Sequence, residues 1–157
     1  MSGTGGVSVN GGGSGNSHGG AGGGGRIAIA VSGVDSSNLT MSASGGQNYI
    51  GIGAIYAGAG TIYVNDAGNS KLIVSNAMPA SYTTPISPVI AEAQQLAINT
   101  LSLTNSQLEF SGGSSQVALA ASSMTFLGRS VLTIPSMTVN GDLVLPANTM
   151  LVQNSTS

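Results

Sequence analysis

The residues that could carry out acid–base chemistry are few and lie far apart in this sequence. The candidates are one histidine and five carboxylates: His18, Asp35, Asp66, Glu92, Glu109 and Asp142. A glycosidase needs two carboxyl groups about 5 to 10 Å apart across the sugar, and strand stacking could bring distant residues together. Each acid, however, is predicted to lie at a turn or strand edge, where lone carboxylates are mostly solvated. We therefore predict no catalytic residue.

Metal and cofactor sites are not expected either. The chain has no cysteine, which excludes thiolate metal ligands, cysteine nucleophiles and disulfides. A single histidine cannot supply a zinc site without other nitrogen or sulfur ligands nearby. Residues 20–25 formally match GxGxxG, but the dinucleotide fingerprint needs a strand before it and a helix N-terminus after it. Here a predicted strand follows the glycines, so we expect no cofactor.

Tyrosines are the best candidates for ligand binding. Glycan sites usually combine an aromatic platform with amides and hydroxyls. Of the four tyrosines, we select Tyr49 and Tyr56, which flank a glycine-interrupted segment, and Tyr82, which lies in a proline-containing loop. The alternative for each of them is packing on a sheet edge.

The charge content limits the classes of partner. The chain has 157 residues, enough for one domain with a substantial core. Only 5% of the residues are charged, against about 25% in an ordinary domain. Nucleic acid and anionic lipid both require clustered cations, so neither is an expected partner. A surface of hydroxyl and amide groups is typical of a secreted or cell-surface structural protein.

Targeting signals are not apparent in the sequence. No apolar run approaches the roughly 18 residues of a membrane span, so we expect no membrane insertion. No signal-peptide pattern follows Met1. We therefore expect the chain to be one piece of a longer protein.

Glycine dominates residues 1–25, which hold thirteen of the 25 glycines. Such a tract is either a flexible lead-in or a set of extended, polyproline-II-like strands that approach closely because they lack side chains. Both alternatives are open. The direct continuation of the tract into a strand favours order.

Alternating apolar residues predict several strands after the glycine tract. In the first half these are 26–31, 39–43, 61–64 and 71–75. The glycine-bearing loop 65–69 predicts that the last two strands form a hairpin or corner. Residues 49–56 carry three isoleucines interrupted by glycines, which fits a strand with close backbone approach better than a helix.

Residues 77–97 are predicted to be a crossover between two halves. Pro79, Pro85 and Pro88 exclude a central strand or a helix over 77–88. Residues 91–97 have helix-forming composition, but about two turns are too short to be stable unaided. A capping helix and a strand that feeds the next segment are both open.

Residues 98–152 contain three copies of one short sequence motif, here called the phrase. The copies, 101–110, 124–134 and 137–145, each consist of an apolar alternation, a small polar or glycine turn and a second alternation. Period-2 alternation with such a corner predicts two short strands, and its recurrence is typical of a stacked solenoid. The predicted units are a lead-in (1–25), a first strand block (26–76), the crossover (77–97), solenoid repeats (98–152) and a polar tail (153–157).

The inward residues of these strands form the predicted core. They are Ile27, Ile29, Val31, Leu39, Met41, Ile62, Val64, Leu72, Val74, Leu101, Leu103, Leu108, Phe110, Phe126, Val139, Leu143 and Leu145. Burial of each contributes roughly 1.5 to 3 kcal/mol. Because the repeats leave few side chains for chemistry, we expect any recognition surface in the less regular first half, around 49–56 and 77–88.

A series of short motifs resembles one family. After the glycine tract come Gly24-Gly-Arg26-Ile-Ala-Ile29, Gly58-Ala-Gly-Thr-Ile-Tyr-Val64 and Asn69-Ser-Lys-Leu-Ile-Val-Ser-Asn76. This order resembles a module of large bacterial surface and secreted proteins with glycine-rich β-strand repeats, which are described as adhesin-like or filamentous-haemagglutinin-like. The continuation, from Thr83-Thr-Pro85 into the phrase at 101–108, is similar to those proteins as well.

The resemblance implies an all-β fold, a parallel β-helix or β-solenoid, at a cell surface and without catalytic residues. The expected function is a structural or adhesive module of a surface or secreted fibre that contacts a glycan or a protein. One alternative is an intertwined trimeric fibre or tail-tip segment for host or prey recognition, in which three chains share one core. A carbohydrate-active β-helix enzyme is the third hypothesis.

Overall fold

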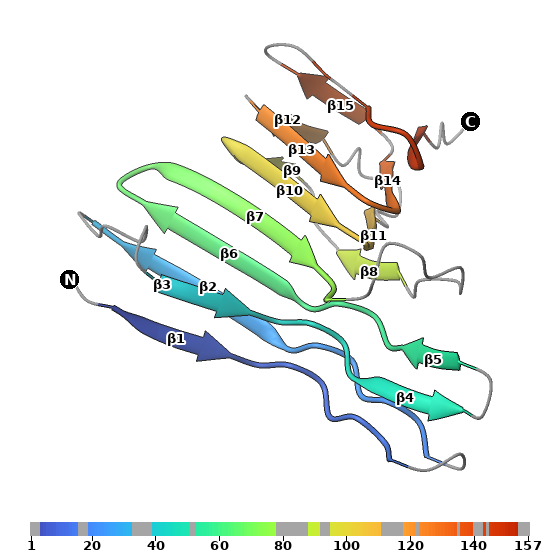
Figure 1. Cartoon of the computed structure of the whole chain (residues 1–157). Coiled ribbons are helices and arrows are strands. Elements are labelled where there is room, and N and C mark those ends of the chain that lie inside the picture. Colours follow the sequence, from blue (N-terminus) through green and yellow to red (C-terminus); the bar gives the residue numbers. More distant parts are fainter. Residues whose placement is uncertain are drawn as a thin grey trace.

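The structure is a computed structural model of the chain (Figure 1). It describes residues 4–15, 19–32, 39–50, 53–77, 88–91, 95–110, 118–121, 123–134, 136–139, 143 and 145–153. Within these residues the fold is all-β, with sixteen strands and no helix. The predicted all-β class is therefore confirmed.

Two layers of strands make up the first half. The front layer is a parallel pair, β1 (Gly5–Ser8) and β3 (Leu39–Ser42). Behind it lie β2 (Arg26–Val31), β6 (Thr61–Asp66) and β7 (Asn69–Ser75). In this rear layer β2 runs parallel to β6, and β6 and β7 form an antiparallel hairpin.

Alternation in the strands supplies the apolar contact between the two layers. Ile27, Ala43, Ile62 and Val64 are buried there, and Ile29, Met41 and Ile73 pack against them half-buried. The opposite face of the hairpin carries Tyr63, Leu72 and Val74, which pack into a second core. Around β7 the rear layer is therefore apolar on both faces, as expected where a sheet is covered on both sides.

Glycine-rich main chain continues both layers beyond the strands. Segments 9–14, 20–25, 43–47 and 57–60 run side by side, and each is hydrogen-bonded to at least two of the others. For example, Gly46 N–H donates to the Gly22 carbonyl at 2.8 Å, and Gly24 N–H donates to the Gly58 carbonyl at 3.0 Å. Within the described residues the glycine tract is therefore ordered, and it bonds in more than one direction.

This close approach explains the glycine content. A Cβ atom at Gly24 or Gly60 would lie closer than 3.0 Å to main-chain atoms of a neighbouring segment. Real Cβ contacts essentially never come so close, and a dense interior cannot yield the space cheaply. Side-chain-free residues are thus a packing requirement at these positions.

Three parallel sheets make up the second half, and the chain visits them in the same order on successive passes. The first sheet adds β10 (Thr100–Thr104) and β13 (Ser123–Leu127) to β7. The second consists of β8 (Pro88–Ala91), β11 (Gln107–Phe110), β14 (Ser130–Ile134) and β16 (Thr149–Gln153). The third consists of β9 (Gln95–Ala97), β12 (Ala118–Ala121) and β15 (Ser136–Val139). Every pairing among these strands is parallel.

The register of these sheets aligns inward residues in columns. Three such columns are Leu72–Leu101–Met124, Val74–Leu103–Phe126 and Leu108–Leu132–Leu151. Leu101, Leu103, Leu108 and Leu132 are fully buried, and Phe126 is 2% exposed. The outward positions of β10 and β13 hold mainly hydroxyl residues, such as Ser102 beside Thr125. Alternation thus separates an aliphatic core from a polar surface.

Polar side chains satisfy the main chain at the corners. The buried Ser106 hydroxyl donates to the Val74 carbonyl at 2.8 Å. Asn105, at a positive φ of 46°, accepts the Arg129 N–H on its Oδ1 at 3.3 Å. Asn is one of the few residues that adopt this left-handed conformation readily, which explains its place at the bend.

Most strand predictions agree with the structure. Those for 26–31, 39–43, 61–64 and 71–75 correspond to β2, β3, β6 and β7, and Ala67 and Gly68 turn the hairpin. Of the two alternatives for 91–97, the structure has the strand, β9. Pro88 opens β8, which is an edge strand, one of the places where proline is tolerated in a sheet.

One strand prediction was confirmed in part, and another was wrong. Residues 49–56 are strand rather than helix where they are described, but they belong to two strands, β4 (Gln47–Ile50) and β5 (Gly53–Tyr56), which pair antiparallel. The third phrase is out of register with the first two: Met137 pairs with Leu119 rather than with Met124. Among the described residues the next strand after β15 begins at Thr149, and Pro146, which cannot donate to a ladder, precedes it.

The core prediction was confirmed in part. Ten of the predicted residues are buried: Ile27, Ile62, Val64, Leu72, Val74, Leu101, Leu103, Leu108, Phe110 and Phe126. The prediction for Leu145 was wrong, since this side chain is 43% exposed. The side chain of Val139 lies outside the described residues. The prediction omitted Ile98, Leu132 and Ile134, which are buried.

Candidate binding groove

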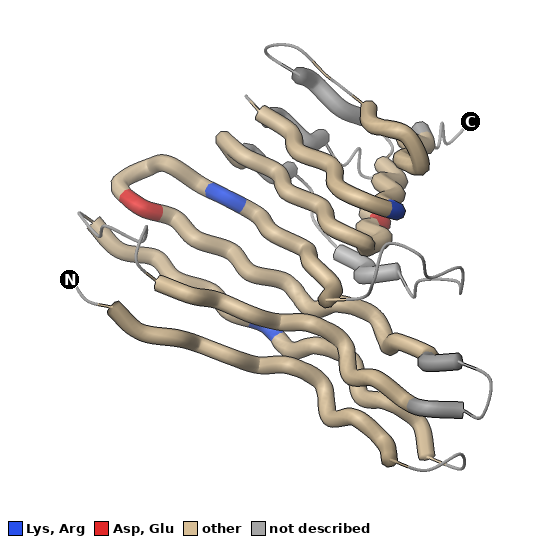
Figure 2. Tube along the Cα trace, viewed as in Figure 1, with Lys and Arg blue, Asp and Glu red and all other residues tan. Residues whose placement is uncertain are grey.

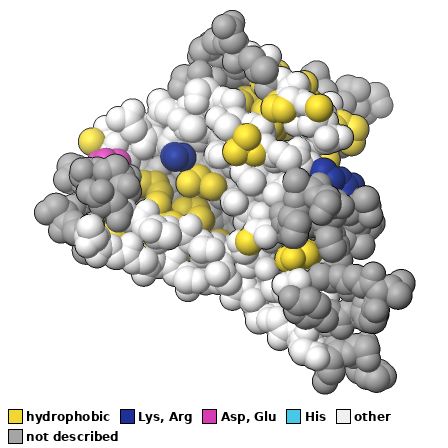
Figure 3. All heavy atoms as spheres, in the orientation of Figure 1, with side chains coloured by type: hydrophobic (Ala, Val, Ile, Leu, Met, Phe, Trp, Pro, Cys, Tyr) yellow, Lys and Arg dark blue, Asp and Glu magenta, His cyan; other side chains and the backbone are white. Residues whose placement is uncertain are grey.

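A groove lies beside β3, where the front layer stops and the rear layer continues. Leu39 and Met41 of β3 form one wall, and Val64 and Ile73 of the β6–β7 hairpin contribute apolar surface to its floor. Its volume is about 540 Å³. Figure 3 shows apolar side chains at the bottom of a hollow on this face, with basic atoms at its border.

The pairing of the hairpin explains why these side chains share one face. Val64 lies opposite Lys71, and Ile62 lies opposite Ile73; residues directly opposite in an antiparallel pair point to the same side. Ile62 is covered by the front layer, whereas Ile73 and Lys71 lie where that layer ends. The groove therefore results from a two-stranded layer on a wider sheet.

Polar residues border the groove. They are Asp66, Asn69, Ser70, Lys71, Asn99 and Thr100. Ser70 and Asn99 are bonded to each other: the Asn99 Oδ1 accepts the Ser70 N–H at 2.8 Å and the Ser70 hydroxyl at 3.1 Å. This pair fixes the start of β10 against β7 and thereby holds the far rim in place.

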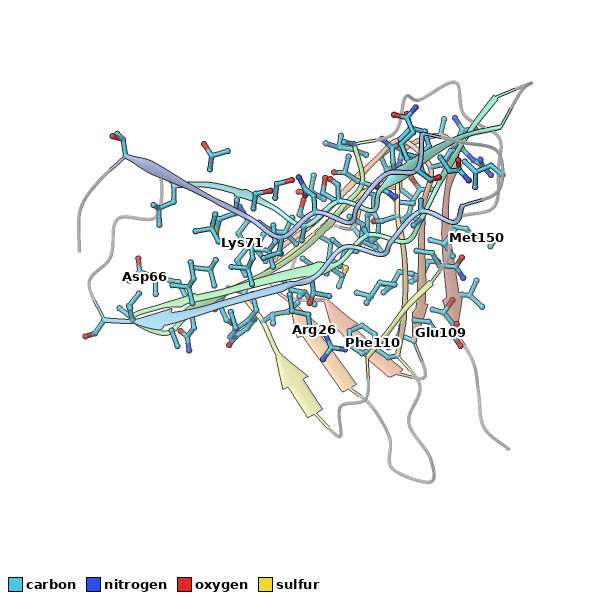
Figure 4. All side chains as sticks on the ribbon, turned by 90° about the horizontal axis from the view of Figure 1, so that it is seen from below. Arg26, Asp66, Lys71, Glu109, Phe110 and Met150 are labelled. Atoms are coloured by element: carbon cyan, nitrogen blue, oxygen red, sulfur yellow. The ribbon has the colours of Figure 1, made fainter. Side chains whose placement is uncertain are left out.

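The two charged residues of the groove lie at the turn end of the hairpin. Asp66 and Lys71 occupy diagonal positions of the antiparallel pair, so their Cα atoms are roughly 7–8 Å apart. Figure 4 shows both at the same end of the molecule, with Glu109 at the other end. In the part of the chain that the structure describes, Lys71 has no ion pair, and its side chain is exposed.

This set of polar and charged groups can bind a ligand. Of the described residues that line the groove, Asp66 is the one carboxylate, whereas glycoside hydrolysis uses two. Among the described residues no three His, Cys, Asp or Glu come together in a way that could hold a metal ion. Charged residues are sparse along the whole described trace (Figure 2).

Of the tyrosines selected from the sequence, only Tyr56 has a described side chain, and it is not among the residues that line the groove. Tyr56 lies on β5 and is half-buried. Tyr49 lies on β4, but its side chain is outside the described residues, as is the whole of Tyr82. His18, Asp35, Glu92 and Asp142 also lie outside them, so the acid positions that the structure places are Asp66 and Glu109.

Sequence reasoning missed the groove residues as a set. Leu39 and Met41 were assigned to the core, and nothing in the spacing links them to Thr100. One signal was available: Lys71 is the only lysine of the chain, and it starts an apolar alternation. A charged residue there indicates a strand that is not fully covered.

Comparisons of the chain with protein-family models, with curated proteins and with solved structures gave no match. No helix of the described residues is long and apolar enough to span a membrane.

Proposed function

We propose that the chain is a structural, non-enzymatic module of a bacterial cell-surface or secreted fibre. In this proposal residues 69–153 form a parallel β-helix, and the glycine-rich segments form its packed N-terminal continuation. Adhesive contacts with a glycan or a protein partner would be made by its exposed polar surface and groove.

The observation that carries the proposal is the repeated order of the parallel sheets. β7, β8 and β9 are followed by β10, β11 and β12, and then by β13, β14 and β15, each strand in parallel register with its counterpart on the previous pass. A stack of this kind is extended by adding passes, and each pass contacts mainly its neighbours. Such an architecture suits a stalk.

The burial of the core within one chain supports a module that folds as a single chain. Leu101, Leu103, Leu108 and Leu132 are fully buried within one chain. No second or third chain is needed to remove them from water. This favours the single-chain module over the intertwined trimer.

Light scattering after size-exclusion chromatography tests the single-chain proposal. We expect a mass near the 15.3 kDa of one chain, and a threefold mass would favour the trimeric fibre. A glycan array, run on protein of known oligomeric state, tests the adhesive part. Hydrolysis of a polysaccharide panel, lost in Asp66→Asn or Glu109→Gln, would overturn the non-enzymatic proposal.

A further inference from the structure

The strand that walls the groove has a partner on one side only in the described structure. β3 pairs with β1 and with no other strand. Val9 N–H donates to the Ser42 carbonyl at 2.9 Å, so the main-chain groups of Ser42 face the β1 side. Because successive residues of a strand alternate in direction, the N–H and C=O of Met41 face the opposite edge.

Immediately downstream of Met41, the main-chain groups on that opposite edge are hydrogen-bonded. Gly60 N–H donates to the Ala43 carbonyl at 2.6 Å, two residues beyond Met41. The glycine bundle therefore completes the edge of this layer up to Ala43. From Met41 back to Leu39, the edge lies along the groove.

The floor of the groove matches what an added strand would require. An extended segment beside β3 would lie over Ile73, which is half-buried and, with Met41, offers apolar surface to every second side chain. The remaining side chains would face solvent. The four residues of β3 span about 13 Å at the usual rise, so the edge suits four or five residues.

The chemistry of the border favours a peptide over a sugar. Among the described residues that line the groove no side chain is aromatic, whereas sugar sites commonly use an aromatic platform. It offers instead a row of main-chain donors and acceptors, which an extended peptide satisfies by strand addition. Lys71, exposed and without an ion pair among the described residues, complements an acidic side chain.

We propose that the groove beside β3 is a docking surface for an extended peptide segment of a partner protein. The segment adds as a third strand to the β1–β3 layer, packs apolar side chains at alternate positions against Met41 and Ile73, and sets an acidic residue near Lys71. The inference needs only the groove and the edge of β3, so it stands or falls separately from the fibre proposal.

The test uses the full chain, labelled with ¹⁵N, and a capped synthetic peptide of sequence Thr-Val-Thr-Val-Glu. Two control peptides carry N-methyl groups, one on both valines and the other on both threonines. An added strand bonds β3 through one alternate set of amides only. We therefore expect the parent peptide to shift the amide signals of Met41 and Ile73, one methylated peptide to bind at least tenfold more weakly, and the other to bind nearly as well.

Protein variants give an independent readout. Lys71→Ala should weaken binding of this acidic peptide about two- to fivefold, the range of a solvent-exposed ion pair, and should not change binding of a version with Gln in place of Glu. Val7→Ser, a substitution of an exposed residue of β1 outside the groove, should leave the affinity unchanged.

Three results would overturn the proposal. The first is equal binding by the parent and both methylated peptides, since main-chain pairing would then play no part. The second is no shift at Met41 or Ile73 at millimolar peptide. The third is a shift of the same signals by a soluble oligosaccharide instead of the peptide, which would assign the groove to glycans.

Discussion

The side-chain amide of Asn76 donates a hydrogen bond from Nδ2 to the carbonyl oxygen of Ala57 at 2.9 Å. Its Oδ1 accepts the Gly45 N–H at 3.2 Å. Asn76 follows the last residue of β7, whereas Gly45 and Ala57 belong to the glycine-rich segments. One buried amide, 2% exposed, thus joins the glycine bundle to the stacked sheets.

Asn76→Ala should destabilise the protein because it leaves a main-chain donor and an acceptor without their partner. We expect the free energy of unfolding to fall by about 1–3 kcal/mol, measured by urea denaturation. Asn69→Ala, at an exposed position of the hairpin, is the control and should change it by no more than about 0.5 kcal/mol. Equal effects of the two substitutions would show that the amide of Asn76 is not the link.

Gly60→Ala should be among the most damaging substitutions in the glycine bundle. Its Cβ would meet main-chain atoms of Gly24 and Gly25, and overpacking of this kind costs about 1–3 kcal/mol or more. Gly12→Ala is the matched control, since a Cβ there meets nothing within 4 Å. Thermal melting should separate the two variants clearly. If both melt like the parent chain, the glycine segments do not pack as described.

Phe126→Ala should remove the largest fully buried side chain of the stack. The cavity and the lost burial should lower the free energy of unfolding by about 3–5 kcal/mol. Leu127, the next residue on β13, is 55% exposed, so Leu127→Ala should cost about 0.5 kcal/mol or less. Alternation of inward and outward side chains on β13 would be refuted if the neighbouring substitution were the more damaging one.

Local patterns predicted the parts of the fold that local chemistry determines. The β6–β7 hairpin follows from two alternating runs around a turn at Gly68, and the first two repeated phrases stack in register, Leu101 beside Met124. The third phrase reads alike but pairs Met137 with Leu119. Its alternating pattern would fit any of the three sheets. The number of residues in each pass therefore decides which strand it pairs with.

The groove and the glycine bundle could not be derived from sequence for a different reason. Gly24 looks like any flexible glycine until Ala43 and Gly60 are placed beside it. Leu39 and Met41 carry the ordinary pattern of a core strand, and only the narrow front layer leaves them at a groove. Both features depend on contacts between segments far apart in the chain, which periodicity does not encode.

Disulfide mapping tests most directly the central claim that successive passes stack in parallel register. The chain has no cysteine, so any disulfide that forms within it must join the two introduced cysteines. Ser102 lies beside Thr125, and Gln107 lies beside Val131. Neighbouring strands are about 4.8 Å apart, within the Cα separation of about 4.4–6.8 Å that a disulfide accepts.

Ser102→Cys with Thr125→Cys, and Gln107→Cys with Val131→Cys, should therefore oxidise fully in air and leave no free thiol. The control combines Ser102→Cys with Leu127→Cys, which is offset by two residues and thus more than about 7 Å apart; it should keep its thiols in the folded protein. Oxidation of the offset pair as readily as the aligned pairs, or free thiols in the aligned pairs, would contradict the stacked register.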